Sequence, residues 1–401
     1  MRSMTDTQRN HAATPADGHR NGDGRRSPAP DASGTSGSLG TSGSSDASGP
    51  SGPKDSNGSP DAHDTSGTLD EALERIHLAG PERDGWLSNH APMAVEALVR
   101  RGQAPAVHRW LDQYRSRLED MPGSVEPVTS GNWHEALGDI DRVGDWTVFF
   151  ERETESLPWR AVLAEWWPRL LPGITGGATH GVIRVGHSVL TLLDGEETAP
   201  RVRELAHALA YWAARFQPLP PLERLAGPAD AAGALERVPL IAEQDGEMLV
   251  RLGRLTAFPD WPGALPQGPE AVRTALQELI TAATHRYATH GHASPIMLVH
   301  AATAPNAVLR ALPALPDSLW VPSLHAAWTA SAAVTSAYGP REGVAVAELR
   351  SGPRDPQEVF ERAAAHGDDH TIKFADTALD VGDATALVAA GRAAELNTPV
   401  W

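Results

Sequence analysis

The chain has 401 residues, of which 51 are acidic and 34 are basic, so its formal net charge at pH 7 is −17. This charge disfavours binding to nucleic acids and to anionic membranes. The chain has no cysteine, which excludes disulfides, thiolate metal sites, iron–sulfur clusters and a cysteine nucleophile.

Residues 1–66 are rich in Gly, Ser, Asp, Pro and Thr and contain almost no large apolar side chains. Such a segment cannot bury enough surface to offset its ordering entropy, so we predict a disordered tail. We find no apolar core of a signal peptide and no run of about 18 apolar residues that would span a membrane. We therefore expect a cytoplasmic protein whose residues 67–401 form one large domain.

Helical spacing of apolar residues dominates the rest of the chain. Thr68-Leu69-Asp70-Glu71 has the pattern of a capping box that opens a helix. Further segments with helical periodicity are 86–102, 104–120, 158–171, 199–216, 269–289, 295–312, 323–337, 356–365, 369–381 and 383–395.

Strand signals are sparse. Residues 182–193 are compatible with a helix or a strand, and residues 248–255 and 344–349 are candidate short strands. Proline-rich stretches near 217–221 and 258–266 indicate surface loops. The fold class that we predict is therefore mainly α.

Lys373 stands out because the chain has only two lysines, and the other, Lys54, lies in the predicted tail. Arginine stays charged at any relevant pH, whereas a buried lysine can lose its proton. A neutral amine can react with CO2 to form a carbamate, whose oxygens bind a metal as a carboxylate does. The alternative is chance survival of one lysine under a strong bias towards arginine.

Several histidines lie in apolar or small-residue surroundings that favour burial. His90 precedes an apolar helical segment, where it is a metal ligand, a helix cap or a hydrogen-bonded core residue. His180 and His187 lie seven residues apart, so on a helix they share one face with Arg184. Packing of helices through the neighbouring glycines is the alternative for this segment.

Two more histidines complete a candidate metal site. His300 is a single polar residue in an apolar run, and His370 lies one helical turn before Lys373. Asp368 or Asp369 is expected to cap that helix, and Gly382 to end it. Imidazole suits Fe, Zn, Cu and Ni, and a carboxylated Lys373 would add the anionic ligand that a set of neutral histidines lacks.

Common motifs of other enzyme classes are absent. We find no His-Glu-x-x-His zinc helix, no phosphate-binding Gly-Lys-Ser/Thr loop and no Gly-x-Gly-x-x-Gly after a strand. The segment His366-Gly367-Asp368 has the spacing of a facial iron triad, although a polar loop before a helix explains it equally simply.

Four segments, in this order, resemble the questin oxidase-like family. They are Asn89-His90-Ala91-Pro92-Met93, residues 179–187 (THGVIRVGH), residues 298–303 (LVHAAT) and residues 369–373 (DHTIK). The resemblance implies a mostly helical enzyme that opens a ring of an anthraquinone-type aromatic polyketide, by Baeyer–Villiger-type oxidation or by dioxygenase cleavage. It also implies a non-haem iron centre with the ligands His90, His180, His300, His370 and a carboxylated Lys373. In fungal members an aromatic residue tends to stand near the position of His187 and a histidine near that of Arg184.

The leading hypothesis is an Fe(II)- and O2-dependent oxygenase with a CO2-derived carbamate on Lys373. Arg184 and His187 are the candidate catalytic residues, for orienting or contacting the substrate, although Arg184 is equally compatible with a structural salt bridge and His187 with a metal ligand. Electrons would come from the substrate, a small reductant or a partner reductase. The alternatives are a metal-dependent hydrolase with a carboxylated lysine and a non-catalytic polyketide-binding protein.

Overall fold

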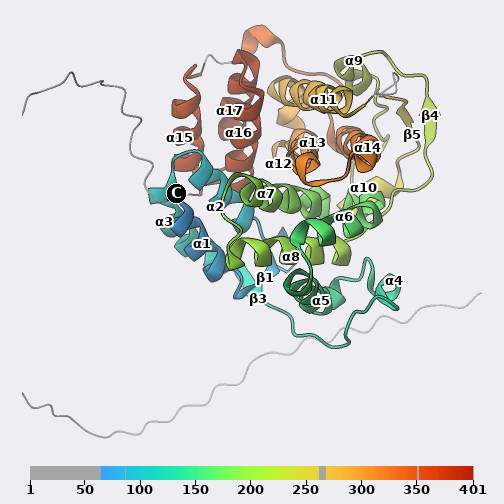
Figure 1. Ribbon diagram of the computed structural model, residues 1–401. Coiled ribbons are helices and arrows are strands. Elements are labelled where there is room, and N and C mark those ends of the chain that lie inside the picture. Colours follow the sequence, from blue (N-terminus) through green and yellow to red (C-terminus); the bar gives the residue numbers. More distant parts are fainter. Residues whose placement is uncertain (1–64, 86, 262–267, 350–351, 401) are drawn as a thin grey trace, which may run out of the picture. The chain divides into compact units, whose positions relative to one another are not determined.

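The computed structural model describes residues 65–401 except 86, 262–267, 350–351 and 401 (Figure 1). All described residues lie in one compact unit, Pro60–Trp401. The predicted disordered tail, residues 1–66, lies outside the described residues apart from its last two. Those two open the first helix, which begins at Thr65, before the expected capping box.

The described part is mainly helical, as predicted. Its α-helices are α1 Thr65–Ile76, α2 Ala91–Arg100, α3 Ala104–Tyr114, α4 Trp133–Ala136, α5 Val143–Ser156, α6 Trp159–Leu170, α7 His180–Asp194, α8 Ala199–Ala214, α9 Ala231–Glu236, α10 Met248–Gly253, α11 Pro269–His290, α12 Pro295–Leu298, α13 His300–Ala311, α14 Trp320–Tyr338, α15 Pro356–His366, α16 Asp369–Val381 and α17 Ala384–Leu396. No helix among the described residues is both long enough and apolar enough to cross a membrane.

Five short strands form two small sheets. Strands β1 (Ala79–Arg83), β2 (Leu87–Ser88) and β3 (Leu118–Asp120) make an antiparallel sheet in the order β2-β1-β3, and β4 (Glu223–Leu225) pairs in parallel with β5 (Ala257–Pro259). In the first sheet Arg83 lies opposite Leu87 on one side and Leu118 on the other. This pairing takes residues 118–120, which we had predicted as helical, out of the helix that ends at Tyr114.

The two candidate strands at 248–255 and 344–349 were wrong. Residues 248–253 form α10, and the second segment has only a 3₁₀ turn at Val346–Glu348. The ambiguous segment 182–193 lies in α7. Short apolar runs fit a buried strand or a buried helix equally well, and only the packing of neighbouring elements decides between them.

Helix α7 lies between α8 and α13 in the centre of the described fold (Figure 1). Its glycines make this possible. A methyl group on Gly186 would come within 2.5 Å of the Ala307 side chain of α13, and one on Gly181 within 2.7 Å of Trp212 of α8. The absence of side chains therefore lets three helices approach closely around the segment that begins at His180.

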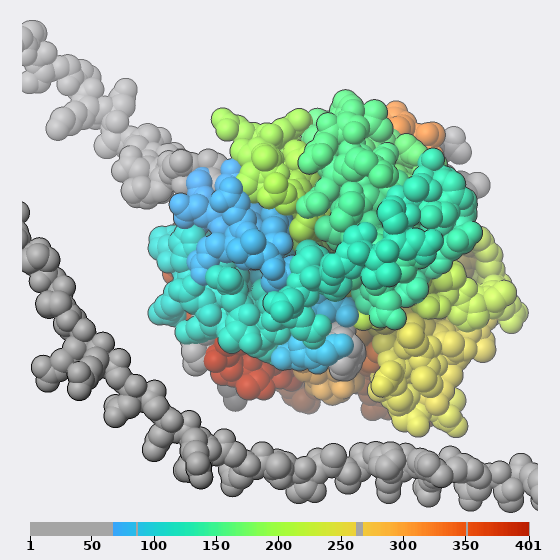
Figure 2. Space-filling view, turned by 90° about the horizontal axis from the view of Figure 1, so that it is seen from below, coloured from blue at the N-terminus to red at the C-terminus, as the bar shows by residue number. Residues whose placement is uncertain are grey.

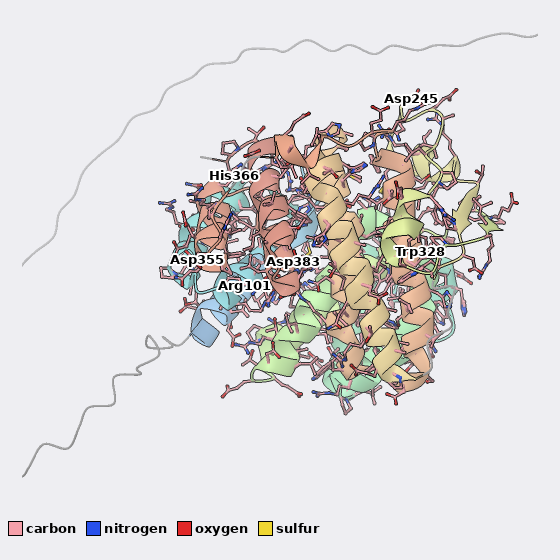
Figure 3. The ribbon with its side chains drawn as sticks, turned by 90° about the horizontal axis from the view of Figure 1, so that it is seen from above. Arg101, Asp245, Trp328, Asp355, His366 and Asp383 are labelled. Carbon is pink, nitrogen blue, oxygen red and sulfur yellow. The ribbon has the colours of Figure 1, made fainter. Side chains whose placement is uncertain are left out.

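The buried apolar residues form two hydrophobic cores. The larger core includes residues of α5–α8, α11, α13 and α14, and the smaller one residues of α1–α3 and α15–α17. The two ends of the described chain pack together, because α2 contacts α16. In Figure 2 the blue-to-cyan N-terminal part accordingly borders the red C-terminal part. Figure 3 shows α17 beside α11, where Asp383 caps α17 and lies 2.7 Å from the ring of His285.

Candidate metal centre

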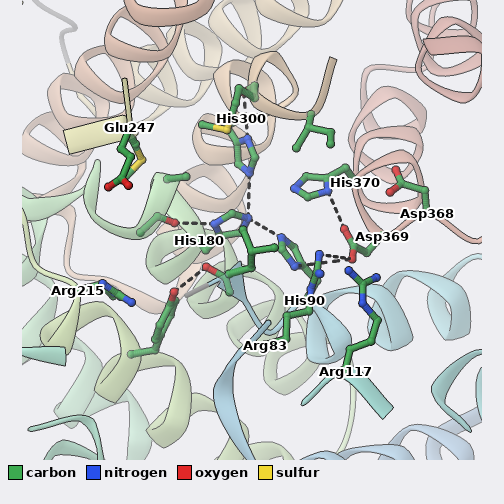
Figure 4. Close-up of a pocket in the computed structure, with 18 of the residues that line it drawn as sticks. Arg83, His90, Arg117, His180, Arg215, Glu247, His300, Asp368, Asp369 and His370 are labelled. Carbon is green, nitrogen blue, oxygen red and sulfur yellow. Dashed lines mark hydrogen bonds and ion pairs between the residues drawn. The ribbon is translucent and has the colours of Figure 1, made fainter. Parts of the chain in front are cut away.

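Four histidines lie close together at the starts of four helices, which belong to both hydrophobic cores. His90 directly precedes α2 and His370 is the second residue of α16, while His180 and His300 are the first residues of α7 and α13. All four side chains are buried. Because side chains lean towards the N-terminus of their helix, this arrangement gathers the rings in one place (Figure 4).

In the histidine cluster, as we call these four residues, the Nε2 atoms of His90, His180 and His300 point towards one another. Nε2 of His180 lies 2.7 Å from Nε2 of His90 and 3.0 Å from Nε2 of His300. Ligand atoms of His90, His180 and His370 all lie within 4.8 Å of one another. The cluster therefore has the compactness of a metal-binding site.

Groups behind the rings fix their orientation. Nδ1 of His180 bonds to the carbonyl of Gly177 at 2.6 Å, and Nδ1 of His300 to the carbonyl of Met297 at 3.0 Å. A carbonyl only accepts, so both Nδ1 atoms carry the proton and both Nε2 atoms present a lone pair. Such support of the outer nitrogen is typical of histidines that bind metals.

Two lone pairs 3.0 Å apart repel unless a positive charge lies between them. Protonation of one ring would supply it, but burial lowers the pKa of His90, His180 and His300 well below the usual value, and positively charged neighbours lower it further. The donor set therefore fits a metal cation better than it fits four unliganded neutral rings.

Asp369 supports the other two histidines. One of its carboxylate oxygens lies 2.7 Å from Nδ1 of His370 and the other 3.8 Å from Nδ1 of His90, and Arg83 contacts the latter oxygen at 3.5 Å. Although burial alone would raise the pKa of Asp369, His370 and Arg83 hold it below its usual value. Asp369 thus stays ionised and brings a negative charge next to the cluster.

Lys373 lies one turn beyond His370 on α16, with an exposed fraction of 1%. Among the described residues no group accepts a hydrogen bond from its Nζ. Burial lowers the pKa of this amine from 10.5 to about 7, although the carboxylates of Asp368 and Asp369 counteract the effect. At pH 7 about half of such an amine is neutral, and the neutral amine is the form that can react with CO2.

The position of the cluster makes an anionic ligand especially favourable. The N-terminus of a helix carries roughly half a positive charge, and four such ends face the site. These partial charges oppose a bare cation and stabilise an anion. A carbamate on Lys373 would therefore fit both the helix ends and the metal.

The backbone before His180 is unusual. Gly177, Ala178 and Thr179 have φ angles of 55°, 55° and 66°, which lie in the left-handed region. For residues with a side chain this conformation costs about 1–2 kcal/mol each. The strained turn aims the Gly177 carbonyl at the ring of His180, and strain of this kind is often found at functional sites.

The cluster borders a cavity of about 1110 Å³. Its walls combine aromatic and aliphatic side chains, among them Trp110, Tyr114, Tyr211 and Phe216, with a similar number of polar and charged ones, among them four arginines. Rings of Trp110 and Tyr114 stack with centroids 4.7 Å apart, and the Tyr114 hydroxyl accepts a hydrogen bond of 2.8 Å from the backbone of His90. This volume is at the upper end for small-molecule sites, so the cavity has room for a ligand of several fused rings.

The structure does not bring the two predicted catalytic residues to this cavity. Arg184 forms a buried ion pair with Glu204, and His187 lies 2.5 Å from Glu96 and 3.5 Å from Arg310. Neither side chain lines the cavity. Both share a helix face with His180, as expected, but the rise of about 1.5 Å per residue puts them about 6 and 10 Å further along α7.

The facial-triad spacing at 366–368 also does not form a site. Nε2 of His366 lies 3.3 Å from the carbonyl of Asn397, and Asp368 caps α16 by accepting a hydrogen bond from the backbone of Thr371. The cap at Asp368 and the end of the helix at Gly382, which has φ +76°, are confirmed. Two supporting residues, Asp369 as a partner of His370 and Tyr114, were not recognisable from any motif.

The model of the Questin oxidase-like family matches residues 87–195. This segment includes α2 and α7, and with them His90 and His180. His300, His370 and Lys373 lie beyond it. No curated protein matches the chain. The resemblance of this chain to the questin oxidase-like family is therefore confirmed, through the segment that carries two of the four clustered histidines.

Proposed function

We propose that this chain is a non-haem iron, O2-dependent oxygenase that cleaves a C–C bond of an anthraquinone-like aromatic polyketide. The family suggests oxidative chemistry on a small aromatic molecule. The observation that carries the proposal is the close approach of the Nε2 atoms of His90, His180 and His300 at the wall of a large cavity that is partly lined by aromatic side chains.

The proposed ligands of the iron are His90, His180, His300 and His370, together with a carboxylated Lys373. Iron held there would supply activation of O2 for reaction with the substrate. Neutral imidazole is a common ligand of iron, and the chain has no cysteine that would favour a softer metal.

Lys373 has the properties that carbamate formation needs. Its neutral nitrogen would attack the carbon of CO2, and loss of one proton would leave a carbamate with one negative charge. Burial protects such a group from competing protons, and the helix ends around it stabilise the anion. The carbamate would then contribute an anionic oxygen ligand next to the carboxylate of Asp369.

The cavity would bind and orient the substrate. Its aromatic side chains would stack on fused rings, and its arginines would attract phenolate or carboxylate oxygens. Burial of the histidines excludes bulk water from the reacting atoms. Electrons would come from the substrate, a small reductant or a partner reductase, and the last of these remains a prediction without structural support.

Metal content and O2 consumption test the proposal together. We expect close to one iron per chain by elemental mass spectrometry, and O2 uptake that requires both iron and a hydroxylated anthraquinone. Zinc in place of iron, with hydrolysis but no O2 uptake, would favour a hydrolase. Tight quinone binding without turnover or metal would instead favour a polyketide-binding protein.

A further inference from the structure

A hydrogen-bonded group of four polar residues, which no role described above uses, lies at the cavity wall. Oγ of Ser88 lies 2.6 Å from the hydroxyl oxygen of Tyr211, and that hydroxyl donates to Glu82 at 3.3 Å. Arg215 also bonds to Glu82, with its Nε at 2.8 Å. We call these residues the Tyr211 relay; three of them, Ser88, Tyr211 and Arg215, line the cavity, and Glu82 lies behind them.

Tyr211 lines the cavity, although only 2% of the residue is exposed. Gly177, another residue of the cavity wall, lies next to it, and a methyl group on Gly177 would come within 3.3 Å of the hydroxyl oxygen. A larger residue at position 177 would therefore crowd the hydroxyl, whereas glycine leaves space beside it. The same Gly177 binds His180 through its carbonyl, so the relay and the histidine cluster border the same space.

Glu82 is a suitable final proton acceptor. It is only 9% exposed, and burial raises its pKa even though Arg215 and Tyr211 counteract the effect, while Glu119 of β3 raises it further. The carboxylate thus has a higher proton affinity than one in water. Arg215 faces both Glu82 and Tyr211 and keeps the group electrically balanced in the resting state.

We propose that Tyr211 is a catalytic residue that takes the proton of a substrate phenol and passes its own proton to Glu82. The inference rests on the proposed function, because it assigns a phenolic substrate to the same cavity. In this step the substrate O–H bond breaks and its proton moves to the Tyr211 oxygen, while the proton of Tyr211 moves to Glu82. The substrate becomes a phenolate, Glu82 becomes a carboxylic acid, and no electrons are exchanged.

The step prepares the substrate for oxidation. A phenolate is richer in electrons than a phenol and gives them up more readily to O2. Arg215 lies where a negative charge near Tyr211 would be stabilised. Tyr211 would touch the substrate, whereas Glu82 would act only through Tyr211.

The ionisation of a bound probe tests the relay without any turnover. A 1,8-dihydroxyanthraquinone, which absorbs at longer wavelength as a phenolate, is added to the protein under anaerobic conditions and titrated with acid and base. We expect the wild-type protein to bind it as the phenolate below the pKa that it has in water. In Tyr211→Phe and Glu82→Gln the midpoint should rise by about one unit or more.

A second buried tyrosine provides the matched control. Tyr287→Phe removes a hydroxyl that bonds to the carbonyl of Pro295 and does not line the cavity, so the midpoint should stay at the wild-type value. Glu82→Gln retains the shape of the relay and keeps the test valid even if Tyr211→Phe folds poorly. Unchanged midpoints in both relay variants would overturn the proposal.

The outcomes separate this inference from the proposed function. If the wild-type protein binds the probe as a phenolate but contains no iron and consumes no O2, the relay is supported and the oxygenase is refuted. O2-dependent turnover with equal midpoints in all variants would support the oxygenase and refute the relay. Failure of the wild-type protein to bind any hydroxylated quinone would refute both.

Discussion

Helix α16 carries two buried ionisable side chains one turn apart, Lys373 and Asp376, and in the described part of the chain only Asp376 has ion-pair partners. Asp376 contacts three arginines: Arg100 and Arg101 near the end of α2, and Arg310 of α13. Lys373, on the same helix, has no hydrogen-bond partner for its Nζ among the described residues. We call the Asp376 group the ion network and compare it with Lys373 and the histidine cluster, whose pKa values Lys373 influences.

The comparison separates ionisable side chains that stabilise the fold from those that are available to bind a ligand. Although burial alone would raise the pKa of Asp376, the arginines lower it well below its usual value, so the carboxylate stays charged and paired. For Lys373 burial prevails and lowers the pKa to about 7, so a large fraction of the amine is neutral at pH 7. Satisfied charges join α2, α13 and α16, whereas the unsatisfied amine and the inward lone pairs form a binding site.

The largest effect is expected from Lys373→Arg. Arginine cannot form a carbamate and remains charged, so this variant should lose iron completely while the wild-type protein keeps about one iron per chain. Elemental mass spectrometry of both purified proteins measures this. Normal iron content in Lys373→Arg would show that Lys373 is not a ligand.

Two further variants test whether the loss of iron is specific to Lys373. Lys373→Ala leaves space for a small anion, so bicarbonate or a short carboxylic acid should restore part of its iron binding. Ile372→Val, a neighbouring core substitution, should cost about 0.5–1.5 kcal/mol of stability but leave the iron content unchanged. Loss of iron in this control as well would point to general damage of α16.

Substitutions in the ion network should mainly change the stability of the protein rather than its metal content. Asp376→Asn removes the fully buried carboxylate of the network and leaves its three arginines only the partly exposed Asp380, which they also contact. Breaking a buried pair in this way typically costs about 3–5 kcal/mol. Denaturant unfolding of the metal-free proteins measures the loss. Asp380→Asn is the matched control, because its side chain is 26% exposed and its loss should cost much less. Equal losses in the two variants would contradict the central role of Asp376.

Much of the fold and most residues of the candidate metal site could be predicted from the sequence. Helical periodicity identified most of the helices, and rarity and an apolar context singled out Lys373 and the four histidines that the structure gathers. The ion network was not predictable, because Arg100 and Arg310 occupy ordinary helical positions and only the packing of α2 and α13 against α16 brings them to Asp376.

The same limit applies to Arg184 and His187. The spacing correctly predicted a shared helix face with His180, but it contains no information about how far along α7 the cavity extends. The sequence did not predict a role for Tyr211, for a related reason. Its partner Glu82 lies on a short strand far away in sequence, and no local pattern links the two.

The smallest expected effect concerns backbone strain, which the histidine cluster has and the ion network lacks. Ala178 adopts φ +55° before His180, whereas Asp376 and Arg310 lie in regular helices. Ala178→Gly should therefore stabilise the protein by up to about 1 kcal/mol, since glycine adopts this conformation without steric cost. In the interior of α14 the same exchange, Ala326→Gly, should instead destabilise it by about 0.5–1 kcal/mol. Thermal and denaturant unfolding of both variants measure the sign of each change. A loss of stability in Ala178→Gly would mean that the turn is not strained, and that the position of His180 is set by packing around α7 alone.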